Sequence, residues 1–169
     1  MKKMGCTQVF LIVVALSAVI FGLLYVIISP AVKSMTEDAV IRGIGNYETE
    51  KYYSSDNLNY TCYRKYVFES VNQENLEKSQ HLQKITPEAM EVLSQYEADF
   101  SRWIKKHSVA GYDFDMSKAD MSDYYYIYSV EDPAATENSE SKYMSYTVYI
   151  FDTETGIIHK LEYKQDLYK

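Results

Sequence analysis

The sequence predicts an α+β fold in which a single N-terminal transmembrane helix precedes a small domain, whose antiparallel sheet packs on a helix at 86–107. Three observations support this prediction. Residues 9–28 are uniformly apolar, residues 86–107 repeat apolar side chains at helical spacing, and several segments concentrate tyrosine, valine and isoleucine as strands do. The expected parts are a cytoplasmic head (1–8), a transmembrane signal anchor (9–29), a juxtamembrane helix and connector (30–56) and an extracytoplasmic α+β domain (57–169).

The apolar run determines the predicted location. Val9 to Ile28 contains twenty residues without a charge or a proline. A helix of that length spans about 30 Å, which matches the hydrocarbon core of a bilayer. Lys2 and Lys3 precede the run, and a basic head of this kind usually stays in the cytoplasm. We therefore expect a single-pass protein of the cell membrane, with the lipid bilayer around residues 9–29 and the C-terminal domain outside the cytoplasm.

Two alternatives to the signal anchor stay open. The first is a domain secreted after cleavage near Ala31, because for a cut after Ala31 the small residues Ser29 and Ala31 occupy the −3 and −1 positions. The second rests on residues 1–14, MKKMGCTQVFLIVV. They resemble the start of a type IV prepilin, with a short basic leader, Gly5, a threonine and a long apolar helix, although Phe10 stands where that family has a glutamate. The resemblance implies cleavage after the glycine and a pilin-like filament subunit.

Charge and cysteine content exclude several classes of protein. The first 29 residues hold two lysines and no acid, so the remainder has 17 − 2 = 15 basic and 24 acidic residues, a net charge of −9. Such a domain repels phosphate backbones, and we expect no nucleic-acid partner. Cys6 and Cys62 would lie on opposite sides of the membrane, so we expect no disulfide. Cys6 is expected to be a juxtamembrane thiol, unmodified or acylated, and Cys62 a small strand residue.

The segment that follows the apolar run is expected to contain two helices, a connector and a strand. Pro30 ends the membrane helix, and the serine and glutamate of Ser34-Met35-Thr36-Glu37 have the spacing of a capping box. The expected elements are a helix at about 35–44, a polar connector reaching residue 56, a strand at 58–71 and a short helix at 74–84.

The clearest local pattern is the helix predicted at 86–107. Thr86 is a good N-cap, Pro87 suits the first helical position, and two glutamates follow near the positive end of the helix. Lysines at 105 and 106 suit the opposite end. One face carries the residues expected to pack in the core, spaced three or four apart: Ala89, Leu93, Tyr96, Phe100, Trp103, Ile104 and His107.

The next segment, YDFDMSKADMSD, raises the question of a calcium site. Its acidic residues are Asp113, Asp115, Asp120 and Asp123. An EF-hand loop needs glycine at its sixth position and glutamate at its twelfth, and counting from Asp113 the sequence has Lys118 and Tyr124 there. We therefore expect solvated loop acids and helix caps, with no metal and no cofactor.

Three strands are predicted at the end of the chain, at 124–131, 143–151 and 157–164. Each is rich in tyrosine, valine or isoleucine. The segment 132–141 between the first two, DPAATENSES, is polar and acidic and is predicted to be a surface linker.

The last two strands are predicted to form a hairpin. Residues 153–156 serve as a four-residue loop, with Gly156 at positive φ and Asp152 capping the turn. His159 then lies on the core face, and we expect a packed structural residue there instead of a catalytic cluster. The register pairs Ile150 with His159, Val148 with Leu161 and Tyr146 with Tyr163 on the core face, and Tyr149 with Lys160 and Thr147 with Glu162 on the other.

Residues 151–158, FDTETGII, resemble the strand–turn–strand of small PepSY-like extracytoplasmic domains, in which an aspartate and a Thr-Gly pair mark the hairpin. The resemblance implies an α+β domain tethered to a bacterial membrane. It also implies binding or restraint of a partner protein.

The predicted function is binding without catalysis, so we expect a non-enzyme. No segment has the spacing of a catalytic motif, whereas the predicted strands carry many tyrosines. Tyrosine supplies amphipathic contact area for a partner such as another envelope protein or a cell-wall component. The alternatives are the pilin-like filament subunit and a secreted hydrolase that uses aspartate and histidine from separate loops. The expected interaction surface consists of Tyr124, Tyr126, Tyr128 and Tyr149.

Overall fold

The structure, a computed structural model, describes residues 38–55, 59–131, 135, 139 and 142–165. The chain divides into two compact units, residues 1–42 and 43–169. In the first unit, the N–H of Ile41 donates to the carbonyl of Asp38 at 3.1 Å, and residues 39–42 form turns in place of the helix predicted at about 35–44. The sheet and the helices belong to the second unit.

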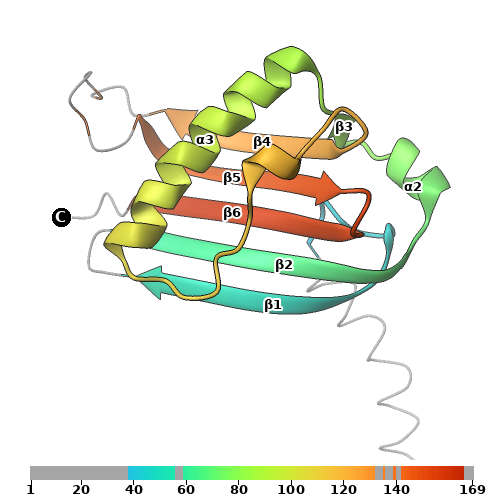
Figure 1. The fold of residues 1–169 in the computed structure, drawn as a ribbon, viewed down its shortest axis with the longest axis horizontal. Helices are drawn as coiled ribbons and strands as arrows, with labels where there is room; N and C mark the ends of the chain where they lie inside the picture. Colours follow the sequence, from blue (N-terminus) through green and yellow to red (C-terminus); the bar gives the residue numbers. More distant parts are fainter. Residues whose placement is uncertain (1–37, 56–58, 132–134, 136–138, 140–141, 166–169) are drawn as a thin grey trace, which may run out of the picture. The chain divides into compact units, whose positions relative to one another are not determined.

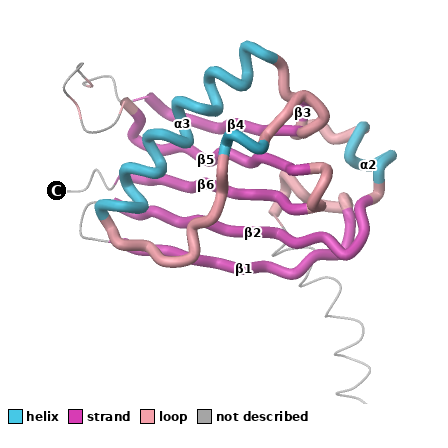
Figure 2. Tube along the Cα trace, viewed as in Figure 1, coloured by secondary structure: helices cyan, strands magenta, loops and turns pink. Residues whose placement is uncertain are grey.

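Six antiparallel strands form one sheet in the order β1-β2-β6-β5-β4-β3. Helix α3 lies across one face of this sheet, and the segment between α3 and β4 crosses the same face (Figure 1). Figure 2 shows that segment as a loop interrupted by one short helical turn, η1. The elements are β1 (Gly45–Ser55), β2 (Asn59–Val71), α2 (Gln73–Glu77), β3 (Gln83–Lys84), α3 (Pro87–Lys106), η1 (Met116–Lys118), β4 (Tyr124–Glu131), β5 (Tyr143–Asp152) and β6 (Ile157–Gln165).

The predicted fold class is wrong. In the part of the chain that is described, the six-stranded sheet dominates and α3 is the one long helix, since α2 has five residues and η1 three. No described helix is long and apolar enough to cross a membrane. The α+β class with an N-terminal transmembrane helix is therefore corrected to an antiparallel sheet that carries one long helix. Residues 9–29, Cys6 and Ala31, on which the location and cleavage predictions rest, lie outside the described residues.

Strand β1 occupies most of the connector predicted up to residue 56. Its sequence, GNYETEKYYSS, lacks the apolar residues of a core strand because β1 is an edge strand. Among the described strands it pairs with β2 alone. Charged side chains such as Glu48 and Lys51 are exposed there, as is usual for a sheet edge that avoids pairing with other chains.

The helix predicted at 74–84 is much shorter in the structure. Helix α2 begins where the side chain of Asn72 accepts a hydrogen bond from the N–H of Asn75, and its C-cap is Lys78. The chain then turns back to place the two residues of β3 beside β4. Leu76 and Leu82 are both buried. Apolar packing therefore stabilises this connection, because a helix of this length is not stable on its own.

Helix α3 confirms the prediction at 86–107. The hydroxyl of Thr86 accepts from the N–H of Ala89 at 3.2 Å, and His107 is the C-cap. Trp103 stacks on Tyr163 with 4.7 Å between ring centroids, so the helix packs on aromatic residues of the sheet. Except for the half-buried His107, the predicted core residues are buried, namely Ala89, Leu93, Tyr96, Phe100, Trp103 and Ile104.

The β5–β6 hairpin also confirms its prediction. Gly156 has a φ of +69°, and Oδ1 of Asp152 accepts from the N–H groups of Glu154 and Thr155 at 2.9 and 3.0 Å. Positive φ favours glycine because it has no Cβ to clash with the backbone. The register agrees pair by pair, with Ile150 opposite His159, Val148 opposite Leu161, Tyr146 opposite Tyr163, Tyr149 opposite Lys160 and Thr147 opposite Glu162.

We predict that Phe100→Ala lowers the free energy of unfolding by about 3–5 kcal/mol, because it leaves a cavity under α3. Phe100 is 0% exposed. Urea unfolding followed through the fluorescence of Trp103, the single tryptophan, measures the change. Val92→Ala on the same helix is the control, since Val92 is 42% exposed and its change is expected to stay within about 0.5 kcal/mol. Equal effects of the two substitutions would contradict the packing described.

Candidate functional site

A cavity of about 150 Å³ lies on the helix-bearing face of the sheet, beside the turn of the β5–β6 hairpin. The hairpin lines one side of it, since the register keeps Ile150 opposite His159 and Asp152 opposite Ile157 on the same face. The segment between α3 and β4 lines the other side, and we call it the covering segment (residues 107–123). The hairpin pocket, as we name the cavity, is lined by Lys65, Asp113, Phe114, Asp115, Lys118, Ala119, Asp123, Ile150, Asp152, Thr155, Ile157 and His159.

Local contacts hold the covering segment over the sheet. Gly111 has a φ of +83°, and a Cβ there would lie 2.2 Å from the ring of Tyr52, so only glycine fits. The hydroxyl of the next residue, Tyr112, donates to Glu97 of α3 at 2.8 Å. The start of the segment is therefore attached both to the first strand and to the helix.

Asp123 attaches the end of the covering segment to the hairpin loop. It is 3% exposed, and its Oδ1 accepts from the N–H and the hydroxyl of Thr153 at 2.9 and 3.1 Å. Its Oδ2 accepts from the N–H of Asp120 at 3.0 Å. Asp123 thus serves the fold, and both of its oxygens are engaged.

A chain of hydrogen bonds joins the pocket to the first two strands. Nδ1 of His159 lies 2.7 Å from the hydroxyl oxygen of Tyr63. That hydroxyl donates to Oδ1 of Asp113 at 2.8 Å, and Nζ of Lys65 donates to Oδ2 of Asp113 at 2.9 Å. Nζ of Lys65 also lies 3.0 Å from Oε2 of Glu50. Side chains from β6, β2, the covering segment and β1 are therefore joined in sequence.

These bonds determine which nitrogen of His159 carries the proton. The Tyr63 hydroxyl has one proton, and it goes to Asp113 because an ionised carboxylate can only accept. The Tyr63 oxygen must then accept from His159, which requires a proton on Nδ1. In the neutral ring Nε2 is left with a lone pair. His159 is 9% exposed and lines the pocket, and no described residue donates to Nε2, so its lone pair is available to a group in the pocket.

Burial keeps the imidazole neutral at neutral pH. It lowers the pKa of His159 to about 4, although the carboxylates of Asp113 and Asp152 act in the opposite direction. Burial also raises the pKa of Tyr63, whose hydroxyl keeps its proton. For Asp113, burial alone would raise the pKa, but hydrogen bonds from Lys65 and Tyr63 outweigh it, and the pKa falls below its ordinary value. The chain therefore combines a neutral imidazole, a neutral phenol and an ionised carboxylate.

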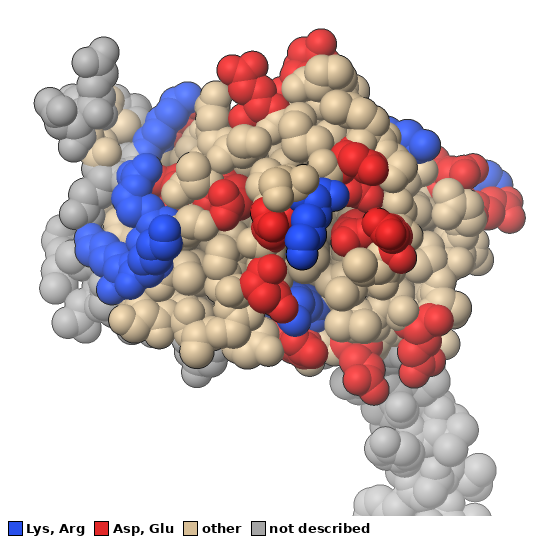
Figure 3. Space-filling model, viewed as in Figure 1, with Lys and Arg blue, Asp and Glu red and all other residues tan. Residues whose placement is uncertain are grey.

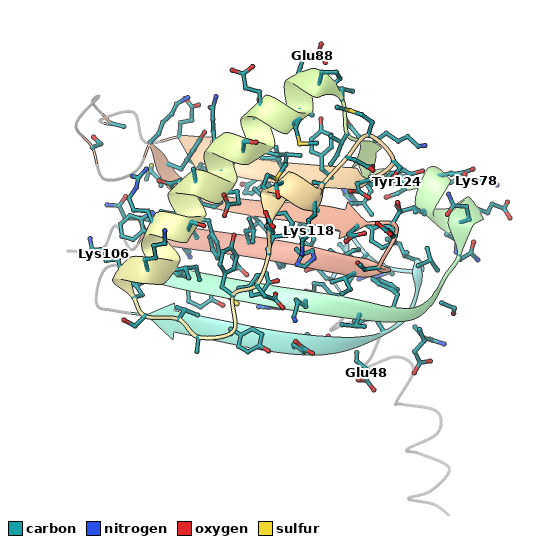
Figure 4. All side chains as sticks on the ribbon, viewed as in Figure 1. Glu48, Lys78, Glu88, Lys106, Lys118 and Tyr124 are labelled. Atoms are coloured by element: carbon teal, nitrogen blue, oxygen red, sulfur yellow. The ribbon has the colours of Figure 1, made fainter. Side chains whose placement is uncertain are left out.

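The pocket lining is negatively charged. It contains four aspartates and two lysines, and with His159 neutral the sum is 2 − 4 = −2. Lys65 lies between Glu50 and Asp113, whereas Lys118 is exposed at the rim. Figure 3 shows acidic side chains gathered on this face around a few basic ones, and Figure 4 labels Lys118 on the turn that crosses the sheet. A cationic group would be attracted to this face.

The tyrosines predicted to form an interaction surface lie on the opposite face of the sheet. The register places Tyr126 opposite Tyr149, and Tyr124 and Tyr128 alternate with Tyr126 along β4. Tyr124 and Tyr149 are buried, at 4% and 3% exposure, while Tyr126 is half-buried and Tyr128 is 58% exposed. Nζ of Lys160 lies 5.0 Å from the centre of the Tyr149 ring. Only the outer part of the predicted surface is therefore open to a partner, and its role stays a prediction.

The other candidates are distributed over the domain. His107 is outside the pocket lining, with Nδ1 3.3 Å from the hydroxyl of Thr61, and Cys62 is fully buried in β2. Asp115 caps η1 and Asp120 accepts from the N–H of Ser122. Within the described ranges, no group of three or more histidine, cysteine, aspartate or glutamate side chains could hold a metal ion.

Sequence analysis missed Tyr63 and Lys65 as site residues. Both belong to the strand predicted at 58–71, and the contacts that define their roles join residues 48, 50 and 96 positions apart. One feature of the sequence could have indicated Lys65. Strand alternation places Lys65 on the same face as Tyr63, the core face, where a lysine requires an acidic partner.

Comparison of the chain with protein-family models, with curated proteins and with solved structures gives no match. The resemblances to PepSY-like domains and to prepilins are not tested by this result. Function is therefore inferred from the pocket itself.

We predict that Tyr63→Phe removes the preference of His159 for a proton on Nδ1, because the accepting oxygen is lost. Nitrogen-15 NMR of the imidazole distinguishes the two tautomers and is expected to show the Nδ1–H form in the unmodified protein. Tyr52→Phe is the control, since Tyr52 stacks on Tyr63 but its hydroxyl donates to Glu50. A tautomer unchanged by Tyr63→Phe would contradict the hydrogen-bond chain.

We also predict that His159 makes the fold sensitive to acid. Its pKa is about 4 when folded and about 6.5 when unfolded, so the folded state binds fewer protons in between. The contribution to stability is complete above pH 6.5 and falls as the pH decreases toward 4. Between pH 7 and pH 5, urea unfolding should show the unmodified protein losing about 2 kcal/mol more than His159→Gln. Equal losses would show that His159 is not buried as a neutral ring.

Proposed function

We propose that residues 43–169 form a binding domain without catalytic activity, and that the hairpin pocket is where it takes a small polar group. The observation that carries the proposal is the lone pair on Nε2 of His159. Tyr63 and Asp113 fix the ring, and no described residue donates to that lone pair. A ligand that donates to this acceptor gains a hydrogen bond worth about 0.5–1.5 kcal/mol.

The shape of the pocket supports the proposal. A cavity of about 150 Å³ accommodates a ligand the size of a benzene ring. Ile150 and Ile157 provide apolar surface, and the aspartates and His159 provide polar groups that fix orientation. Small-molecule sites usually combine these two kinds of lining.

A hydrolase is the second candidate, because the structure does bring a histidine into a pocket with carboxylates. The Nδ1–Tyr63–Asp113 arrangement orients His159 much as a third group orients the base of a catalytic triad. A pKa of about 4, however, makes the imidazole a weak base at neutral pH. Binding is therefore favoured over proton transfer.

Two sequence-based expectations accompany the proposal. A location outside the cytoplasm on a membrane anchor concerns residues 9–29, which are outside the described residues, and it stays a prediction. A larger partner, such as an envelope protein or a cell-wall component, would reach the opposite face of the sheet through Tyr126 and Tyr128.

Methyl NMR of the full chain, labelled at isoleucine, tests the pocket. A set of small cationic, neutral and anionic molecules is titrated, and we expect at least one to shift Ile150 and Ile157 in a saturable way. Ala119→Leu should abolish these shifts because the larger side chain occupies the pocket that Ala119 lines. Val92→Leu on the exposed side of α3 should leave them unchanged. Absence of saturable shifts for every class would contradict the proposed function.

A further inference from the structure

We infer that the ligand of the hairpin pocket is an ammonium group on a short alkyl chain, held by Nε2 of His159 and by the carboxylate of Asp152. The inference rests on the proposed function and specifies the chemical class of the ligand. Three features support it: the kind of hydrogen-bonding groups exposed in the pocket, the balance of charge, and the apolar walls.

The first feature is the supply of acceptors. Nε2 of His159 can only accept, since the proton of the neutral ring lies on Nδ1. Asp152 uses Oδ1 to accept both N–H groups of the hairpin turn, and no described residue donates to its Oδ2. A ligand that meets both atoms must therefore donate at least two hydrogen bonds, and an ammonium group donates three.

The second feature is charge. The lining sums to −2, so it favours a cation over an anion. Lys65 is already counted in this sum, and its ammonium is paired with Asp113 at 2.9 Å and with Glu50 at 3.0 Å. Lys118 is exposed at the rim, where its charge would oppose a cationic ligand and assist an anionic one. Replacing Lys118 therefore separates the two possibilities.

The third feature is the apolar wall. Ile150 is fully buried, and Ile157 and Phe114 are half-buried beside it. The ring of Phe114 packs on that of His159 with 4.7 Å between centroids. Methylene groups would lie against this wall while the ammonium group reaches the acceptors. A chain of about four carbons fits a cavity of about 150 Å³.

The first experiment compares three probes of equal length on the full chain at neutral pH: n-butylammonium, 1-butanol and butyrate. Isoleucine methyl NMR gives the dissociation constants. We expect n-butylammonium to bind at least tenfold more tightly than either of the others. If 1-butanol or butyrate binds equally well, the pocket is a binding site but the inference is wrong. If none of the three probes binds, the ammonium inference is overturned. Titration with the wider set of small cationic, neutral and anionic molecules then decides whether the pocket binds any ligand.

Two substitutions test the charges separately. Asp152→Asn keeps an oxygen that can cap the hairpin turn but removes the charge, so the affinity for n-butylammonium should fall about tenfold. Glu154→Gln is its matched control, since Glu154 is exposed on the same loop and outside the pocket lining, and less than a twofold change is expected. Equal effects would overturn the role of Asp152.

Lys118→Met is expected to change the affinity for n-butylammonium in the opposite direction. Removing a positive charge from the rim should strengthen n-butylammonium binding about threefold. Weakened binding would show that Lys118 attracts the ligand and would overturn the inference. The stability of each variant is measured by urea unfolding, so that a change in affinity is compared between equally folded proteins.

The ammonium group could belong to a free amine or to a lysine side chain of a partner protein. A capped pentapeptide with a central lysine, compared with n-butylammonium, distinguishes these sources. Binding of the peptide and loss of binding when its lysine is acetylated would support a protein partner. Binding of n-butylammonium alone would support a free amine. Either result requires the same acceptors, Nε2 of His159 and Oδ2 of Asp152.

Discussion

The hydroxyl group of Tyr63 determines the arrangement on which the pocket depends. Its single proton goes to Asp113, and its oxygen accepts from Nδ1 of His159. One atom therefore connects β2 to β6 and to the covering segment, and it also decides that Nε2 carries the lone pair. Because the phenol pKa is raised by burial, this division of protons holds throughout the neutral range. Without the hydroxyl, the histidine would have no preferred tautomer and Asp113 would lose a donor.

The position of α3 explains why a cavity forms at all. The buried aromatic face of α3 covers one part of the sheet, where Trp103 stacks on Tyr163 and Phe100 is fully buried. The turn end of the β5–β6 hairpin is covered instead by a loop, which is attached through polar bonds such as that between Asp123 and Thr153. Helix side chains interdigitate with a sheet at close-packed density, whereas the covering segment is held largely through polar contacts, such as that of Asp113 with Tyr63, and leaves space beside it. The pocket lies in that space.

The sequence predicted the elements whose signals are local. The buried face of α3 follows from the spacing of its apolar residues, and the hairpin register follows from the turn chemistry around Gly156. Both are confirmed. Strand β1 could not be predicted because an edge strand has a polar composition, which resembles that of a connector. The pocket could not be predicted either. Its defining contacts join Tyr63 to residues 50 and 96 positions away, and no local pattern encodes such pairs.

His159 shows how a correct prediction of position can leave a role undetermined. Sequence alternation placed this residue on the core face, and the structure confirms that. A leucine would fill such a site without a pKa shift and without an unpaired acceptor, so packing alone does not favour histidine. The bonds to Tyr63 satisfy only one of the two ring nitrogens. The second nitrogen belongs to a residue that lines the pocket, where it can accept from a ligand, and departures from a plain apolar core are usual at functional sites.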